Sequence, residues 1–478
     1  MTASNQPRAR DVPGSMNTAM PEEGKRDRLA RAIVKGCHWL SARSVKSRLL
    51  FEDIAARLLL SDAEGRYTHT LPVADPVYAP VELARRTDEL NVAADRYFSG
   101  IDRDYLLGKP FTDRLFFARR LFDLGVLFHW LRIIPGDVVL ELGAGSCWLS
   151  HLLNRYGCKT IAVDVSPTAL AIGRELFETD AHTNWSLEPE FVAYDGHRLP
   201  LDDGSVDKII VYDAFHHVPN YGAVLAEMAR VLGDGGIIGM REPGRHHAAA
   251  EKSQAEVREF GVLENDVIVE DIERLGRQCG LDRTTIVPLT IDDSVEVPAS
   301  ELGQFMRARN LRAVWEPLCT ALVETNFILM YKGTPRLDTR RPGLLDARIR
   351  PVSQSDPLAV RAGQPSSLTV EVENAGDTLW LADTAGVPGW TQLGLRLHTA
   401  DKAETLIDGE WQRARLPRDV PPGDSVRIVV ELPALGSASV GAGNYIVVFD
   451  LVAEGVAWFA DVNSPTARLG LRVVPADD

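Results

Sequence analysis

Two carboxylates and two glycines share the stretch from Val138 to Asp164. An apolar run ends at Glu141, a Gly-x-Gly turn follows at Gly143 and Gly145, and a second apolar run ends at Asp164, nineteen residues after Gly145. Glycines let a ligand approach the backbone closely, and an acid about 20 residues further on can accept hydrogen bonds from both hydroxyls of a ribose. This spacing predicts a nucleoside-binding loop within a strand-helix-strand unit.

The loop lacks the features of a dinucleotide site. Such a site has a further glycine three positions after the second, where this chain has Trp148. A nucleoside without a pyrophosphate therefore fits better. These residues resemble the first motif of the class I S-adenosylmethionine-dependent methyltransferases, which is an acid, one residue and a G-x-G-x-G loop. The last glycine of that motif is Cys147 here, so its side chain must point away from the cofactor.

The resemblance implies a cofactor, S-adenosylmethionine, and a set of residues that hold it. Glu141 and the two glycines would line the methionine and ribose side, Asp164 would hold the ribose diol, and Asp195 would accept from the adenine amino group. Alternatively, Asp195 is a turn acid before Gly196. The predicted cofactor-binding residues are Glu141, Gly143, Ala144, Gly145, Asp164, Val165, Asp195, Gly196 and Asp213.

Two histidines, His216 and His217, follow the predicted fourth strand, a position that the resemblance places opposite the methyl group. A histidine can take the proton of a hydroxyl when a carboxylate orients its ring. Glu242, at the tip of the neighbouring strand, is the candidate partner. We therefore predict His216, His217 and Glu242 as catalytic residues. His246 and His247 leave the identity of the base open, and one histidine of each pair can instead serve only packing or capping.

No metal site is predicted. Adjacent histidines on an extended segment point apart, and no third ligand has suitable spacing. The five cysteines form no C-x-x-C pair, which argues against a disulfide framework or a zinc cluster and suits a reducing cytoplasm. They are Cys37, Cys147, Cys158, Cys279 and Cys319.

Strands and helices alternate from about residue 115 to residue 333, which predicts an α/β fold with a doubly wound, Rossmann-like sheet. Ligands of such sheets lie beyond the carboxyl ends of the strands, where the acids and histidines above all fall. The run AEMARVLGDGGIIG, residues 226–239, also matches the methyltransferase pattern. We assign residues 115–333 to a class I methyltransferase domain.

The segment before this domain divides into two parts. Residues 1–24 lack periodicity and are predicted to be disordered. Residues 25–114 are predicted to form a helical segment and a lid, in which aromatic rings stack near the adenosine or the substrate and Lys109 meets a carboxylate. Ordinary helix packing of these aromatics is the alternative. Between Lys25 and Arg48 there are eight basic residues and one acid. We favour a solvated helix here, and weak contact with a membrane surface is the alternative.

Composition changes after the Pro- and Arg-rich linker at residues 334–343. From residue 344 to residue 478, alternating apolar runs separated by Gly, Pro and Asp turns predict a β-sandwich of roughly seven strands. This region resembles the immunoglobulin-like accessory modules of bacterial surface-polysaccharide enzymes. A carbohydrate or protein partner would dock through an indole, unless the indoles fill the core. The four indoles are those of Trp380, Trp390, Trp411 and Trp458.

Charge and hydropathy limit the partners. The formal net charge of -15 argues against a nucleic acid substrate. The N-terminus has no apolar signal core, and no uncharged run approaches the roughly 20 residues that a bilayer requires. The protein is expected to be soluble and cytoplasmic.

We therefore hypothesise a methyltransferase that O-methylates a hydroxyl of a glycan or glycolipid intermediate. Two alternatives stay open. One is methylation of a small lipid or natural product, and the other is a non-catalytic scaffold with a vestigial cofactor site, of which Cys147 would be a symptom.

Overall fold

The computed structural model describes residues 83–289, 299–305, 318–319, 321–353, 355–384, 386–400, 406–432, 435 and 440–475. The chain divides into two compact units, Met1–Leu71 with Ser294–Cys319, and Pro72–Asp293 with Thr320–Asp478. Within the first unit, the described residues are the 3-10 helix η3 (Ala299–Glu301), the short helix α12 (Leu302–Phe305) and residues 318–319. The predicted disordered tail and basic helix lie outside the described residues.

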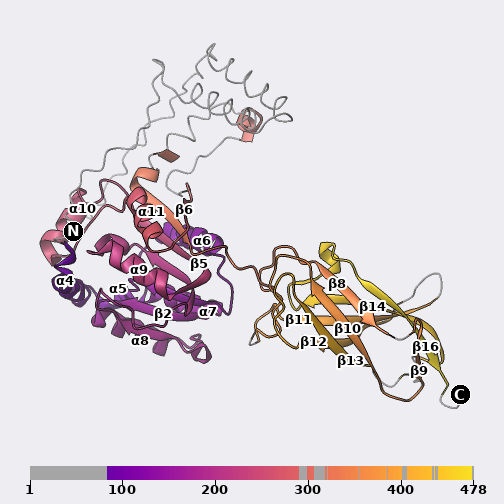
Figure 1. Ribbon diagram of the computed structural model, residues 1–478. Coiled ribbons are helices and arrows are strands. Elements are labelled where there is room, and N and C mark those ends of the chain that lie inside the picture. Colours follow the sequence, from indigo (N-terminus) through magenta and orange to yellow (C-terminus); the bar gives the residue numbers. More distant parts are fainter. Residues whose placement is uncertain are drawn as a thin grey trace, which may run out of the picture. The chain divides into compact units, whose positions relative to one another are not determined.

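Seven strands form one sheet in the order β3-β2-β1-β4-β5-β7-β6 (Figure 1). Neighbouring strands are parallel except at β7, which is antiparallel to both β5 and β6. The mostly parallel, doubly wound sheet predicted from the sequence is therefore confirmed. The strands are β1 (Val138–Leu142), β2 (Lys159–Asp164), β3 (Glu190–Ala193), β4 (Val206–Tyr212), β5 (Leu232–Pro243), β6 (Arg283–Ile286) and β7 (Thr325–Tyr331).

Helices cover both faces of this sheet because successive side chains of each strand point to opposite faces. On β1, Val139 packs with α6 and α7, whereas Leu140 packs with α9 and α11 on the other face. Ala162 of β2 packs against α8. These helices are α6 (Phe117–Leu131), α7 (Trp148–Tyr156), α8 (Pro167–Thr179), α9 (Tyr221–Val231) and α11 (Val269–Gln278).

The strand order reverses between β1 and β4, and open α/β sheets bind ligands at this kind of switch point. The loops that follow these two strands touch each other there. A Cβ atom on Gly143, whose φ is +73°, would lie 2.4 Å from the Cβ of Ala214. Only glycine fits this contact and this backbone conformation.

Three further helices lie beside the carboxyl ends of the strands. They are α4 (Thr87–Gly100), α5 (Arg103–Leu107) and α10 (Glu251–Phe260). On α4, the Asp95 carboxylate accepts hydrogen bonds from the Ser166 hydroxyl at 2.6 Å and the Thr168 N–H at 3.0 Å, at the start of α8. This carboxylate therefore attaches α4 to the loop after β2. Within the described ranges, no helix is both long and apolar enough to cross a membrane.

The residues from β8 onward form two further sheets, with orders β13-β10-β8 and β12-β11-β14-β16-β9. Inward side chains of both sheets share one apolar core. A two-sheet sandwich is therefore present. Its strands are β8 (Ala347–Val352), β9 (Leu358–Arg361), β10 (Ser366–Asn374), β11 (Thr391–Thr399), β12 (Leu406–Arg415), β13 (Ser425–Leu432), β14 (Gly443–Ala453), β15 (Ala457–Trp458) and β16 (Ala467–Val474).

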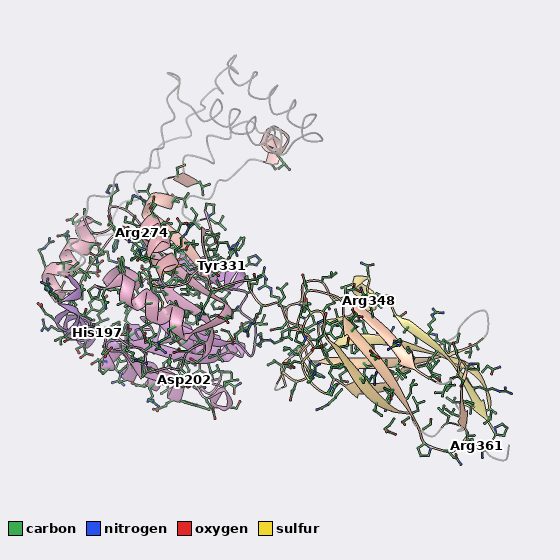
Figure 2. All side chains as sticks on the ribbon, in the orientation of Figure 1. His197, Asp202, Arg274, Tyr331, Arg348 and Arg361 are labelled. Carbon is green, nitrogen blue, oxygen red and sulfur yellow. The ribbon has the colours of Figure 1, made fainter. Side chains whose placement is uncertain are left out.

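Charged residues pair across the outward face of the smaller sheet. Arg348 on β8, which lies at the surface (Figure 2), pairs with Glu373 on β10 at 2.6 Å. On β13, apolar inward residues alternate with exposed ones, as expected for a strand with one face on a core.

The indoles of the sandwich differ in burial. Trp380 is fully buried and its ring meets that of Phe459 edge-on, with 5.4 Å between centroids. Of the two possibilities for Trp380, docking and core packing, the structure shows core packing, because its indole fills the core of the sandwich. Trp390 and Trp458 are partly buried, and Arg396 and Arg413 lie over the Trp458 ring. The side chain of Trp411 lies outside the described part.

We expect Trp380→Ala to lower the unfolding free energy of the sandwich by about 3–5 kcal/mol, the usual cost of truncating a buried aromatic side chain. In calorimetry, the sandwich transition should fall by roughly 10 °C or more. The control is Val429→Ala, on the exposed face of β13, which should leave the midpoint nearly unchanged. Equal midpoints for the two variants would contradict the core assignment.

Candidate active site

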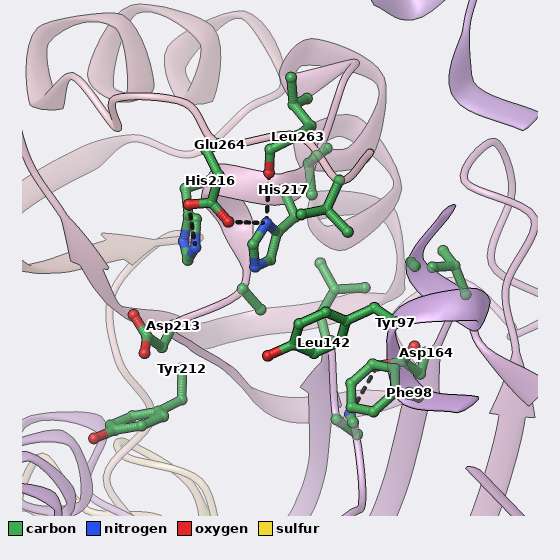
Figure 3. A pocket seen from close by; sticks show the side chains of 18 of the residues that line it. Tyr97, Phe98, Leu142, Asp164, Tyr212, Asp213, His216, His217, Leu263 and Glu264 are labelled. Carbon is green, nitrogen blue, oxygen red and sulfur yellow. Dashed lines mark hydrogen bonds and ion pairs between the residues drawn. The ribbon is translucent and has the colours of Figure 1, made fainter. Parts of the chain in front are cut away.

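A cavity of about 670 Å³ lies at the carboxyl ends of β1, β2, β4 and β5. Most of the predicted site residues line it, on segments that are far apart in the sequence. Of the predicted cofactor-binding set, Glu141, Gly143, Ala144, Gly145, Asp164, Val165, Gly196 and Asp213 line the cavity, together with His216 and His217 of the predicted catalytic set. Figure 3 shows Asp164 at one end of this cavity and His216 and His217 at the other.

The glycine loop and the tip of β2 are joined directly. One Asp164 oxygen accepts the Gly145 N–H at 2.7 Å, and the other accepts the Ser166 N–H at 2.8 Å. Burial raises the pKa of Asp164 to about 6. The backbone hydrogen bonds lower this pKa, but their effect is smaller than that of burial. Each carboxylate oxygen can accept a further hydrogen bond, so Asp164 can still hold a diol.

Cys147 occupies the last position of the loop motif, and its side chain points away from the cavity. The residue is fully buried with φ +56°, and a Cβ atom on Gly173 of α8 would lie 2.2 Å from its sulfur. The Cys147 side chain therefore occupies the space that a side chain at Gly173 would fill. Because it packs there, Cys147 does not project into the cavity.

Glu141, at the end of β1, contacts the first turn of α7. Its Oε2 accepts the Ser150 N–H at 2.8 Å and the Ser150 hydroxyl at 2.5 Å. Burial raises the pKa of Glu141 to about 8, although these two hydrogen bonds lower it. The carboxyl group both lines the cavity and holds α7 in place.

Asp195 lies differently from the other predicted cofactor residues. It is exposed, and its Oδ1 accepts the N–H groups of His197 and Arg198 at 2.8 and 3.0 Å. The His197 ring lies at the surface (Figure 2). Asp195 does not line the cavity, whereas its neighbours Tyr194 and Gly196 do. The structure thus favours the turn role over the adenine contact.

Aromatic side chains of the predicted lid line the cavity as well. They include Tyr97 and Phe98 of α4 and Tyr105 of α5. A Cβ atom on Gly145 would lie 3.2 Å from the Phe98 ring, so this ring covers the glycine loop. Lys109 lies over the Tyr105 ring, and burial, with Arg120 nearby, lowers its pKa to about 8.

The structure brings the predicted pair His216 and Glu242 together. Nδ1 of His216 lies 2.8 Å from Oε2 of Glu242. The other Glu242 oxygen accepts the N–H groups of Ala214 and Phe215, each at 2.9 Å. Burial alone would lower the pKa of His216, but Glu242, Asp213 and Glu264 together raise it. Both members of the pair are buried, so the orientation of the ring is fixed.

His217 has a different environment. Its Nδ1 lies 2.6 Å from the Leu263 carbonyl oxygen, which can only accept, so this nitrogen carries the proton and Nε2 keeps its lone pair. The side chain is 42% exposed at the cavity wall. Enclosure in the cavity lowers the pKa of His217 to about 4, and the neighbouring His216 contributes a smaller part of this shift.

Sequence reasoning gave no role to Glu264, which lies beside both histidines. Its Oε2 is 3.8 Å from Nε2 of His216 and 2.7 Å from Nε2 of His247, and its Oε1 is 3.4 Å from Nδ1 of His217. Glu264 follows α10 in an irregular connection without periodicity, so the sequence offers no signal that would bring it here.

The prediction that the side chains of His216 and His217 point apart is wrong. They lie on a 3-10 turn, η2 (Phe215–His217), and not on an extended segment. Their ring centroids are 3.9 Å apart, and the His247 ring is 4.9 Å from that of His216. His216, His217 and Glu264 place one potential ligand atom each within 4.8 Å of one another.

Asp213 also lines the cavity. The residue has φ +55° and its Oδ1 accepts from Arg241 at 3.1 Å. Burial would raise its pKa, but Arg241 and the nearby histidines hold the pKa of Asp213 well below its usual range. Asp123 lies 3.1 Å from Arg241 on the other side. Asp213 therefore remains a carboxylate facing the cavity.

The comparisons with known proteins agree with this fold. Residues 140–240 match the model of a family described as a methyltransferase domain. An uncharacterized methyltransferase of Mycobacterium tuberculosis is 36% identical over 113 residues, which is 23% of this chain and 42% of that protein. A demethylmenaquinone methyltransferase of Corynebacterium efficiens is 29% identical over 147 residues, 31% of this chain and 55% of that protein.

Among solved structures, a putative sarcosine dimethylglycine methyltransferase from Galdieria sulphuraria is similar, with a TM-score of 0.33 and 19% identity, over 52% of this chain and 100% of that one. The chain spans about half the length of the curated relatives that it matches. Residues 140–240 thus match a methyltransferase-domain model and lie within a doubly wound, mostly parallel sheet.

The raised pKa of Glu141 predicts a pH-dependent effect of Glu141→Gln. The folded chain holds this proton up to about pH 8, whereas the usual pKa is 4.5. Wild-type stability should therefore fall as pH rises between these values, because unfolding releases the proton. Measured by thermal denaturation from pH 5 to 9, the variant should gain stability relative to wild type until about pH 8 and then level off.

Glu178→Gln, on the exposed face of α8, controls for the loss of one negative charge. A Glu141→Gln effect that is constant across this pH range would show that the buried carboxyl group is ionised throughout.

Proposed function

We propose that this chain is an S-adenosylmethionine-dependent methyltransferase that methylates a hydroxyl group. The observation that carries this proposal is the division of one cavity into two chemically different ends. A glycine loop joined to Asp164 lies at one end, and a cluster of histidines and carboxylates lies at the other.

The nucleoside end suits a neutral sugar and base. Asp164 would accept from the ribose hydroxyls, and the backbone at Gly143 and Gly145, which lines the cavity, would contact the methionine part. The rings of Tyr97 and Phe98 would cover the nucleoside from α4. S-adenosylmethionine, when bound, supplies an electrophilic methyl group on a sulfonium.

The opposite end suits an acceptor that must lose a proton. Methyl transfer requires the nucleophilic oxygen in line with the methyl group, and positioned side chains that receive its proton. His217 presents an unprotonated Nε2, and His216 is oriented by Glu242 at 2.8 Å. We propose that the hydroxyl binds beside these two histidines.

For the acceptor we propose a glycan or glycolipid intermediate. The support comes from the sandwich, whose sheet orders β13-β10-β8 and β12-β11-β14-β16 correspond to strands E-B-A and C′-C-F-G of an immunoglobulin domain. Such a module would recruit the polymer or a protein partner, with the partly buried Trp390 or Trp458 at its contact surface.

A lipid acceptor is the second candidate. It is favoured by the relative named demethylmenaquinone methyltransferase. Comparison of glycan and lipid extracts from cells with and without the protein separates the two candidates. We expect one glycan species to lack the mass of a CH₂ group when the protein is absent. A change confined to lipids would remove the glycan proposal.

Cofactor binding is tested by calorimetry with S-adenosylhomocysteine. We expect Asp164→Ala to weaken binding about 10- to 100-fold, because hydrogen bonds to a charged group contribute about 1.5–3 kcal/mol each. The matched control is Asp195→Ala, which removes an acid at the neighbouring strand end that does not line the cavity. This control should bind nearly as wild type does.

His217→Ala should bind S-adenosylhomocysteine like wild type but should fail to restore the modified glycan in cells that lack the protein. Restoration by this variant would remove the histidine from the proposed chemistry. The absence of nucleoside binding to the wild-type chain would favour the scaffold hypothesis.

A further inference from the structure

We propose that His216, His217 and Glu264 bind a divalent transition-metal ion at the acceptor end of the cavity. Figure 3 shows the Glu264 carboxylate beside both histidine rings. One ring nitrogen from each histidine and one carboxylate oxygen lie within 4.8 Å of one another. Ligand atoms of a tetrahedral zinc ion lie about 2.0–2.2 Å from it, so neighbouring ligand atoms are roughly 3.5 Å apart. The three side chains must therefore approach one another by up to about 1 Å when the ion binds.

The second nitrogen of each ring is already held by a hydrogen bond. Nδ1 of His216 lies 2.8 Å from the Glu242 carboxylate, and Nδ1 of His217 lies 2.6 Å from the Leu263 carbonyl oxygen. Histidines that bind metals almost always donate the other ring N–H to a carboxylate or a carbonyl group in this way. The His216 ring thus has the tautomer and the support that metal ligation through Nε2 requires. In His217, Nδ1 is the nitrogen beside Glu264, at 3.4 Å from Oε1, so a small rotation of the ring would have to bring Nε2 to the ion.

Glu264 supplies the third and independent observation. Its side chain is 3% exposed, yet Oε1 has no hydrogen-bond partner. Buried carboxylate oxygens are normally satisfied, and an unsatisfied one calls for an explanation such as an ion. The other oxygen, Oε2, lies 2.7 Å from Nε2 of His247, which fixes the direction of the carboxylate.

The donor set indicates the class of ion. Two imidazole nitrogens and one carboxylate oxygen suit Zn²⁺, Fe²⁺, Mn²⁺ or Co²⁺, whereas Mg²⁺ and Ca²⁺ prefer oxygen ligands alone. With three protein ligands, the ion keeps open positions, as catalytic metal sites do. Both histidines line the cavity. If the proposed methyl transfer is correct, these positions would receive the oxygen of the acceptor, and His217 would act as a ligand of the ion and not as the group that takes the proton.

Titration of the chelator-treated full chain with Co²⁺ tests this proposal, with the visible absorption bands of the ion as readout. We expect saturation at one ion per chain. Glu264→Gln and His217→Ala should each weaken binding tenfold or more, because loss of an outer partner alone costs about 10- to 100-fold. Circular dichroism checks that both variants are folded.

The matched control is His182→Ala, which removes the exposed partner of Asp180, a histidine-carboxylate pair at 2.9 Å outside the cavity. It should bind Co²⁺ as wild type does. The proposal would be overturned if the folded wild-type protein bound no Co²⁺. It would also be overturned if Glu264→Gln and His217→Ala both bound Co²⁺ as tightly as wild type does.

Calorimetry with S-adenosylhomocysteine on the same metal-free samples separates this inference from the proposed function. Nucleoside binding without Co²⁺ binding removes the metal site and leaves the methyltransferase proposal intact. Co²⁺ binding without nucleoside binding does the reverse.

Discussion

The architecture of the site depends on carboxylates at strand ends that accept backbone N–H groups of neighbouring loops. Asp164 accepts from Gly145, Glu141 accepts from Ser150, and Glu242 accepts from the turn after β4. Each acid lies at the carboxyl end of its own strand and holds a segment that begins elsewhere. The loops around the cavity are therefore positioned by hydrogen bonds from N–H groups to carboxyl groups, and these hydrogen bonds are stronger where the carboxyl group is ionised.

This arrangement explains how buried acids can serve both structure and chemistry. Burial raises the pKa of Asp164 and of Glu141, so ionisation of either carboxyl group costs free energy. A ligand that donates hydrogen bonds would stabilise the ionised form of Asp164. Glu242 likewise shapes the turn after β4 and orients His216 with the same carboxylate.

The strands of the sheet were largely predictable because their apolar runs are continuous and end at acids or glycines. The run Val138–Leu142 is a strand with those bounds. The apolar run of the fifth strand starts at Ile237 in the sequence, whereas β5 begins five residues earlier, at Leu232. Its pairing with β4 shifts between Val206 and Lys208, which accommodates the glycines before Ile237. A glycine-rich segment can continue a strand when a bulge absorbs the extra residues.

The cluster at the acceptor end was only partly predictable. His216 and Glu242 follow from the rule that strand ends meet at one edge of a sheet. Glu264 does not, because its position depends on how the connection after α10 packs and not on a local pattern. The burial of Trp380 was equally undecidable, since the sequence gives the spacing of the strands but not which indole faces inward.

The proposed function requires a sulfonium nucleoside at the glycine loop, with its ribose hydroxyls on Asp164. A crystal structure of the chain with S-adenosylhomocysteine tests this placement. We expect the ribose hydroxyls within hydrogen-bond distance of the Asp164 carboxylate and the sulfur facing His217. A nucleoside bound outside this cavity, or a cavity that stays empty at saturating concentrations of the compound, would contradict it.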